Sequence, residues 1–239
     1  YLDPGKRPGP AERIRRGKSK RKTVRLFDLI RKYKRILKNR NLCLKDNKVE
    51  LLDAYDVQLI QTGLEIQKKR KDAVFKFNQI FGDLYFKVTD IDGLSIKYSP
   101  SWKKKDENHI ESNPFADSNI PSVENILEHV RRMRQQELIM GTTMSGPHRD
   151  RIEFEVHGNP FIPTASTGQR RMVALVLRTA QAVYYRDATG KNPVLLMDDV
   201  MLEVDPEKRK KITALLPKYD QLFCTFLPGE PYENYVREN

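Results

Sequence analysis

The fold class is decided by the stretch VLLMDD at residues 194–199. Its four apolar residues precede the paired carboxylates Asp198 and Asp199, and such a short apolar run is typical of a strand covered on both faces in an α/β layer. Ligands of these sheets collect outside the carboxyl ends of the strands. We therefore expect one acid to hold Mg²⁺ and the other to polarise a water that attacks a phosphate. The alternative is that the pair only ends a strand and begins a turn.

A Ser-Thr-Gly-Gln-Arg-Arg stretch at residues 166–171 opens the helix expected before this strand. Apolar side chains recur after it at helical spacing and predict one buried stripe, formed by Met172, Val173, Leu175, Val176, Thr179 and Val183. Ser166 and Gly168 thus lie at a helix N-terminus, where free N–H groups and the helix dipole attract anions. The competing interpretation is plain helix capping by Ser166 or Thr167.

The same alternation of helix and strand continues after the acids. Asp205 followed by Pro206 predicts an N-cap and a helix through about Leu216, and residues 221–226 predict another strand. Repeated αβ alternation indicates a mainly parallel sheet.

Charge is concentrated near the amino end. Residues 1–41 contain 16 Lys and Arg and three acids, a net of +13, whereas the remainder has 28 basic and 29 acidic residues. Residues 4–22 have almost no apolar content, so we expect a mobile arm or extended loop that binds a nucleic-acid backbone through counterion release. The alternative is a solvated charge run or linker.

The middle of the chain has a different pattern. Helical spacing predicts an amphipathic helix from Val24 and a second helix from Val49 to about Phe77, together a helical hairpin in which Gly63 allows close packing or a bend. Strands at 84–89 and 94–98 are expected around Asp90-Ile91-Asp92-Gly93. A polar loop holding Trp102, a helix at 122–138 capped by Ser122, and a hairpin of 152–156 with 161–162 complete the interpretation.

Residues 141–205 resemble the carboxyl-terminal half of the RecF family, which are SMC-like ABC ATPases of DNA replication and repair. The motifs occur in the family's order: Gly146-Pro147-His148-Arg149-Asp150, Ser166-Thr167-Gly168-Gln169, Leu195-Leu196-Met197-Asp198-Asp199-Val200 and Glu203-Val204-Asp205. Upstream, Tyr33 and Leu37-Lys38-Asn39-Arg40-Asn41 also resemble a family segment, and Tyr1-Leu2-Asp3 resembles a triplet. Thr167, Arg170, Arg151 and Leu202 depart from the family pattern, which bears on hydrolysis rate more than on fold.

The resemblance implies roles for individual residues. Asp198 would be the Walker B aspartate that supports Mg²⁺, and Asp199 would orient the hydrolytic water as the catalytic acid. Ser166, Gly168 and Gln169 of the signature would contact ATP held by the opposite subunit of a dimer, with Asp205 as the D-loop aspartate there. Thr225 would approximate the switch position. The candidate DNA-binding residues are Arg13, Arg15, Arg16, Lys18, Lys20, Arg21, Lys22 and Arg149. The sequence leaves open whether His148 and Arg149 anchor DNA or tie lobes together.

A phosphate-binding loop of the form Gly-x-x-x-x-Gly-Lys-Ser/Thr is missing from the pattern. Gly17-Lys18-Ser19 lacks the earlier glycine, because Glu12 stands there, and no apolar strand precedes it. We therefore expect a partial protein without the amino-terminal lobe, which binds ATP poorly and does not turn it over alone. A sheet completed by another lobe would leave unpaired edges and exposed apolar surface.

The fold expected is α/β: a basic arm at 1–23, a helical domain at 24–139 with a short coiled-coil-like hairpin and a small β-hairpin, and an ABC-ATPase-like lobe at 140–239. The resemblance implies ATP and Mg²⁺ as cofactors, an ATP-dependent homodimer, and gapped, single-stranded and double-stranded DNA with RecR and RecO-type mediators as partners. Two cysteines and no bilayer-length apolar run lead us to expect a cytoplasmic, nucleoid-associated protein without membrane contact. The alternatives are another SMC-like or RecN-type ATPase half and a degenerate, non-catalytic DNA-binding module.

Overall fold

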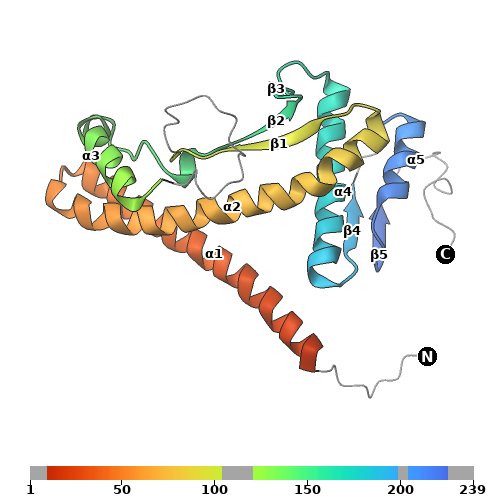
Figure 1. The fold of residues 1–239 in the computed structure, drawn as a ribbon, viewed down its shortest axis with the longest axis horizontal. Coiled ribbons are helices and arrows are strands. Elements are labelled where there is room, and N and C mark those ends of the chain that lie inside the picture. Colours follow the sequence, from red (N-terminus) through yellow and green to blue (C-terminus); the bar gives the residue numbers. More distant parts are fainter. Residues whose placement is uncertain (1–9, 104–120, 199–203, 226–239) are drawn as a thin grey trace. The chain divides into compact units, whose positions relative to one another are not determined.

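The fold mixes long helices with short strands (Figure 1). This computed structural model describes residues 10–103, 121–198 and 204–225, with side chains from residue 26 onward. The chain divides into two compact units, one made of residues 1–73 and 98–152 and the other of residues 74–97 and 153–239. We call them unit 1 and unit 2.

Unit 1 is built on two long helices, α1 (Pro10–Lys45) and the first part of α2 (Leu52–Thr89), joined through the short 3₁₀ helix η1 (Val49–Leu51). The apolar faces of α1 and α2 meet in a buried cluster of Tyr33, Ile36, Leu59 and Ile66. This packing confirms that the two helices lie against each other. Residues 10–22, expected to be an extended arm, instead form the first turns of α1. Lysine, arginine and alanine are good helix formers, so a low apolar content did not exclude a helix there.

The third helix of unit 1, α3 (Val123–Met140), packs on α2. Its predicted cap is confirmed, because the Ser122 side chain accepts a hydrogen bond from the backbone N–H of Asn125. Trp102 is buried between the helices beside Ile60, Ile126 and Val130. Its ring lies over Gly63, where an added Cβ would come within 2.6 Å of the indole. Gly63 therefore serves close packing.

Unit 2 begins with the end of α2, which packs on a three-stranded sheet of order β1 (Leu94–Ser99), β2 (Arg151–Val156) and β3 (Asn159–Pro160). The strand expected at 84–89 is wrong. The helix continues to Thr89 because Phe81, Tyr85 and Val88 repeat at helical spacing on a face that is fully buried. Aromatic contacts build this core, with ring centroids of Phe81 and Phe154 5.8 Å apart.

The hairpin expected after the Gly-Pro-His-Arg-Asp motif is present, with β3 two residues earlier than expected. Strand β2 pairs antiparallel with β3 across His157 and Gly158, whose φ angles are +48° and +81°. Two positive φ angles are the geometry of a tight hairpin turn, so the side chains on either side are held in register.

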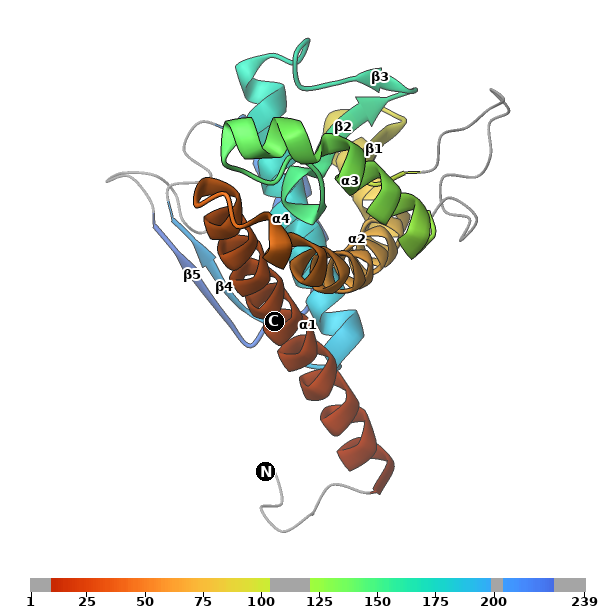
Figure 2. The same cartoon turned by 90° about the vertical axis from the view of Figure 1, so that its left-hand side faces the viewer.

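The remainder of unit 2 is an α/β layer made of α4 (Thr167–Thr189), β4 (Val194–Met197), α5 (Pro206–Leu215) and β5 (Gln221–Cys224). Strands β4 and β5 pair in parallel, as expected, and run side by side in Figure 2. Helix α4 turns the predicted stripe, except the half-buried Val183, towards the core, with Met172, Val176 and Thr179 buried.

One expectation about β4 is wrong within the described residues, because the strand is covered on one face only. Leu195 and Met197 face inward, whereas Val194 and Leu196 are 55% and 76% exposed. Strand β5 shows the same alternation of exposed and half-buried residues, and its Phe223 is exposed. The run of apolar residues therefore leaves an uncovered apolar face on this two-stranded sheet.

Candidate functional site

The carboxyl ends of β4 and β5 bring Asp198 and Thr225 together. Met197 and Cys224 are register partners at the ends of the two strands, and the backbone N–H of Thr225 donates to the carbonyl of Met197 at 3.1 Å. The Thr225 hydroxyl then donates to Oδ1 of Asp198 at 3.0 Å. Residues 27 positions apart in the chain thus place a carboxylate and a hydroxyl at one edge of the sheet. Asp199 lies outside the described residues.

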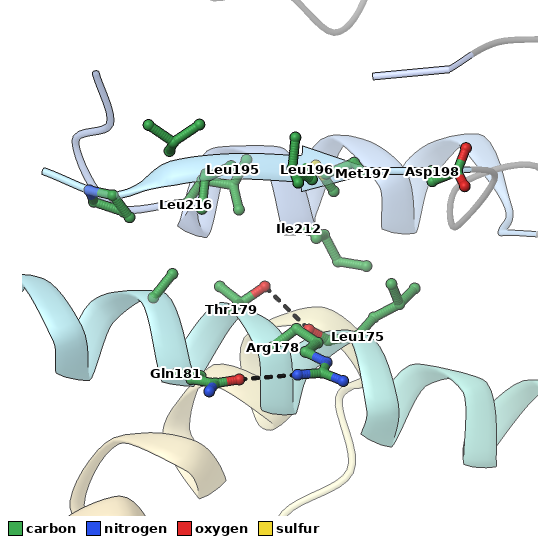
Figure 3. A pocket seen from close by; sticks show the side chains of 13 residues that line it. Leu175, Arg178, Thr179, Gln181, Leu195, Leu196, Met197, Asp198, Ile212 and Leu216 are labelled. Carbon is green, nitrogen blue, oxygen red and sulfur yellow. Dashed lines mark hydrogen bonds between the residues drawn. The ribbon is translucent and has the colours of Figure 1, made fainter. Parts of the chain in front are cut away.

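A cavity of about 440 Å³ lies beside this edge, between α4, β4 and α5 (Figure 3). Its walls are mainly apolar, with Leu175 of α4, Leu195 of β4 and Ile212 of α5 among them. Asp198 lies at one end, beyond Met197, as Figure 3 shows. Apolar walls offer few partners to a charged ligand, so the polar chemistry belongs to the strand ends rather than to the interior of the cavity.

The N-terminus of α4 is closed by a capping box. The Ser166 hydroxyl accepts from the backbone N–H of Gln169, and the Gln169 side chain accepts from the backbone N–H of Ser166. The capping interpretation of Ser166 is therefore confirmed as its local role. Gly168 is exposed, and a Cβ added there would meet only the Ser166 hydroxyl, at 4.0 Å. Among the residues that the structure describes, neither packing nor a positive φ angle requires glycine at that position.

The two polar ends of the layer lie on the same side. Helix α4 runs antiparallel to β4, so the end of α4 that carries Ser166 and the end of β4 that carries Asp198 point the same way (Figure 1). Asp205 also behaves as expected locally. It is the N-cap of α5, with Pro206 at the first helical position. A hydrogen bond from the backbone N–H of Glu207 lowers the pKa of the Asp205 carboxyl, which favours its ionised form.

The Gly146-to-Asp150 motif holds unit 1 together. Within it, η3 (Pro147–Arg149) directs the His148 ring towards α1, where Nδ1 shares a hydrogen bond of 2.8 Å with the Tyr33 hydroxyl. The other ring nitrogen lies 3.1 Å from the carbonyl of Thr143. Partial burial lowers the pKa of the His148 imidazole. His148 therefore links α1 to the segment around Thr143 within unit 1. Arg149 is exposed and stays a candidate for binding DNA.

Asp150 also holds unit 1 together, a structural role that the sequence analysis did not assign to it. Its carboxylate is 2% exposed and accepts hydrogen bonds from four different groups. These are the Gln67 side chain at 2.8 Å, the Arg70 guanidinium at 2.7 Å, the Tyr98 hydroxyl at 2.5 Å and the backbone N–H of Ser101 at 2.9 Å. The acid thus joins the motif to α2 and to the end of β1. One carboxylate thus satisfies four donors.

Arg40 is the third residue that holds unit 1 together, and its side chain is fully buried. Its Nε donates to Asp56 at 2.6 Å, Nη2 to Glu137 at 2.6 Å and Nη1 to the Thr143 hydroxyl at 2.8 Å. Helices α1, α2 and α3 therefore meet at one guanidinium. The sequence holds a signal for it, because Arg40 follows Tyr33 and Ile36 at the spacing of the apolar face of α1.

No described helix combines the length and apolar character needed to cross a bilayer. Over the same residues, no group of three or more His, Cys, Asp and Glu side chains is placed to hold a metal ion. The described side chains of the first helix begin at residue 26, so those of the candidates from Arg13 to Lys22 lie outside the description.

No protein-family model matches the chain. Individual proteins do. The chain is 47% identical over 212 residues to the DNA replication and repair protein RecF of Treponema pallidum, a match that covers 89% of this chain and 56% of that protein. The RecF of Carboxydothermus hydrogenoformans is 30% identical over 206 residues, covering 85% and 54%. The chain is homologous to part of RecF. It spans about half the length of the RecF relatives that it matches.

The folds agree as well. A solved structure of the recombination mediator protein RecF-ATP in the RecFOR pathway matches with a TM-score of 0.70 and 26% identity, covering 94% of this chain and 60% of that one. A second RecF structure, with 23% identity and the same TM-score, supports the fold. The family motifs expected from the sequence therefore stand on a RecF-like backbone.

Proposed function

We propose that this chain supplies the signature, Walker B and D-loop half of a RecF-like ATPase that acts on DNA in replication and repair. One observation carries the proposal: Asp198 and Thr225 meet by a hydrogen bond at the carboxyl ends of two register-matched parallel strands. Ligands of α/β layers bind at this edge. The arrangement supports an ABC-ATPase-like lobe, since an acid and a switch-type hydroxyl lie where a nucleotide would approach.

Asp198 and its neighbours fit a magnesium nucleotide. Carboxylate and hydroxyl oxygens are the hard ligands that Mg²⁺ prefers, and Mg²⁺ is bound by one or two carboxylates together with substrate phosphates. Asp198 would hold the ion, which neutralises charge on the phosphates when bound. Thr225 would fix the carboxylate in place, and Asp199 would orient water.

Ser166, Gly168, Gln169 and Asp205 would act across a dimer interface. Leu175 lines the cavity with Asp198, and about 14 Å of helix separates Leu175 from Ser166 at 1.5 Å per residue. Ser166 is not among the residues that line this cavity, so we assign the signature to the nucleotide of the other copy rather than to the one beside Asp198. The open space around Gly168 also supports approach from outside. ATP bridging two copies would favour the homodimer.

We infer the partners from two similarities: to RecF proteins named for DNA replication and repair, and to the structure of RecF-ATP in the RecFOR pathway. We propose DNA with single-stranded and gapped double-stranded regions as the substrate, and RecR and RecO-type mediators as protein partners. Recombinase loading would then be the output, with ATP controlling the bound state. Such a protein would work in the cytoplasm at the nucleoid.

The test supplies the part of RecF to which this chain has no counterpart in the match. The part of Treponema pallidum RecF that this chain does not match is purified and added to the chain, and ATP turnover is measured with and without Mg²⁺. We expect turnover only for the mixture, and its loss in Asp198→Asn. Asp187→Asn is the matched control, because Asp187 is an exposed aspartate on α4 of the same unit.

The variant Gly168→Ala separates signature function from folding. Alanine replaces glycine near the start of an exposed helix, so the thermal stability of the chain should stay equal or rise by up to about 1 kcal/mol. ATP-dependent dimerisation in the mixture should fall at least tenfold by analytical ultracentrifugation. Duplex binding that is tight, indifferent to ATP and unchanged in Asp198→Asn would instead support the degenerate DNA-binding module.

A further inference from the structure

The outer face of α1 carries a basic stripe of five exposed side chains: Arg31, Lys34, Arg35, Lys38 and Lys45. At 3.6 residues per turn, these positions fall within an arc of about 100° around the helix. The buried residues Tyr33, Ile36 and Arg40 lie on the opposite side. The stripe therefore projects away from the packed core of unit 1.

Little in the described chain neutralises this stripe. Arg31 lies 3.8 Å from Asp28, but both side chains are more than half exposed, and such pairs contribute little. The nearby acid Asp46 pairs with Lys48 rather than with the stripe. Among the described residues, the four other stripe cations have no carboxylate within 4.0 Å. Like charges left together on one helix repel, so a partner with regularly spaced negative charge would be favoured.

The length of the stripe fits a nucleic-acid backbone. From Arg31 to Lys45 the helix rises about 21 Å at 1.5 Å per residue. Duplex DNA presents one negative charge per about 1.7 Å of its axis, so several phosphates lie within that reach. An anionic membrane is a poorer partner, because an interfacial helix inserts a continuous apolar face, and the apolar face of α1 that carries Tyr33 and Ile36 is buried against α2. The exposed large apolar side chains in the described part of α1 are the scattered Leu26, Phe27 and Leu42.

We propose that the basic stripe on α1 binds the phosphate backbone of DNA. The stripe contains none of the DNA-binding candidates named from the sequence, which are the basic residues from Arg13 to Lys22 and Arg149. This site rests on the proposed function only for the identity of the polyanion, and it requires neither ATP nor a second lobe. The backbone of α1 continues without a break through residues 10–25, so the stripe extends a helix whose preceding turns are also rich in lysine and arginine.

The experiment measures binding of the whole chain to a fluorescent 30-base-pair duplex by anisotropy, from 50 to 200 mM salt and without nucleotide. The test variant is Lys34→Gln, Arg35→Gln and Lys38→Gln together. Glutamine has a similar helix propensity, so α1 should be preserved, which circular dichroism checks. The control is Lys191→Gln, Lys210→Gln and Lys218→Gln, which removes the same charge from exposed positions of unit 2.

The stripe variant should bind at least tenfold more weakly at 100 mM salt. Its log–log salt slope should fall by about three, because each of the three removed cations would neutralise about one phosphate. The control should weaken binding less than threefold. Equal weakening in both variants, unchanged binding in the stripe variant, or stripe-dependent binding to phosphatidylserine vesicles without DNA binding would each overturn the proposal. Failure of ATP turnover in the two-part mixture would leave these nucleotide-free outcomes unchanged, so the two proposals fail separately.

Discussion

Replacing Arg40 by methionine should destabilise unit 1 by about 3 kcal/mol or more. Arg40, Asp56 and Glu137 are all fully buried, and removing one partner of such a pair costs roughly 3–5 kcal/mol because a charge remains without compensation. Asp56 keeps a second cation, since Arg134 lies 2.8 Å from its other oxygen. Within the part of the chain that the structure describes, the Glu137 carboxylate keeps only the backbone N–H of Met144. The cost should therefore come mainly from Glu137.

The assay is urea unfolding followed by tryptophan fluorescence. Trp102 is the only tryptophan of the chain and is 3% exposed within unit 1, so its emission reports that unit rather than the whole molecule. With a urea dependence of about 1–3 kcal/mol per M, a loss of about 3 kcal/mol shifts the midpoint by roughly 1–3 M.

Two further variants decide the cause. Lys32→Met, an exposed change on the same helix, should stay within about 0.5 kcal/mol of the parent. Adding Glu137→Gln to Arg40→Met should recover more than about 1 kcal/mol, because it removes the orphaned charge. An Arg40→Met cost below about 1 kcal/mol, or no recovery with Glu137→Gln, would refute the idea that paired burial controls this site.

Three other predictions concern single positions. Gly63→Val should cost about 1–3 kcal/mol and shift Trp102 emission, because a Cβ there lies within 2.6 Å of the ring; unchanged emission would contradict this. The pKa of His148 is lowered in the folded state, so as pH falls through the ordinary value of about 6.5 the unfolded chain takes up a proton that the folded chain does not, and stability decreases as pH is lowered. His148→Gln should lose that part of the pH dependence between about pH 7.5 and 5.5, and parallel urea midpoints for both proteins would refute it. Leu196→Ser should reduce self-association measured by light scattering, because Leu196 is 76% exposed on the uncovered sheet face; equal scattering would argue that this face does not drive association.

Local patterns predicted the layer of unit 2 well. The capping serine of α4, the Asp205-Pro206 start of α5 and the parallel pairing of β4 with β5 all follow from residues close together in the sequence. Such signals succeed because capping, proline position and apolar runs act over a few residues. Asp198 and Thr225 were each expected near the end of a strand, but the hydrogen bond that joins them was not predicted.

The errors arose where tertiary packing decided the outcome. Residues 84–89 have strand-forming side chains, yet Tyr85 and Val88 are fully buried on a helix. Burial against the sheet outweighed the local preference. The hydrogen bonds of Arg40 join residues 97 and 103 positions apart. No local pattern identifies such partners, so the network could not be predicted although the arginine stood on an apolar face.

The motif residues that resemble RecF fall into two physical classes. Arg40, His148 and Asp150 have their hydrogen-bonding groups engaged inside unit 1, so the chain's own folding accounts for them. Gly168 is different, because neither its backbone conformation nor packing against the described part of the chain requires it. A residue that the fold does not need is better explained by something outside the fold. Similarity to RecF at Arg40, His148 and Asp150 therefore argues for a shared architecture. Only similarity at residues such as Gly168 argues for a shared nucleotide chemistry.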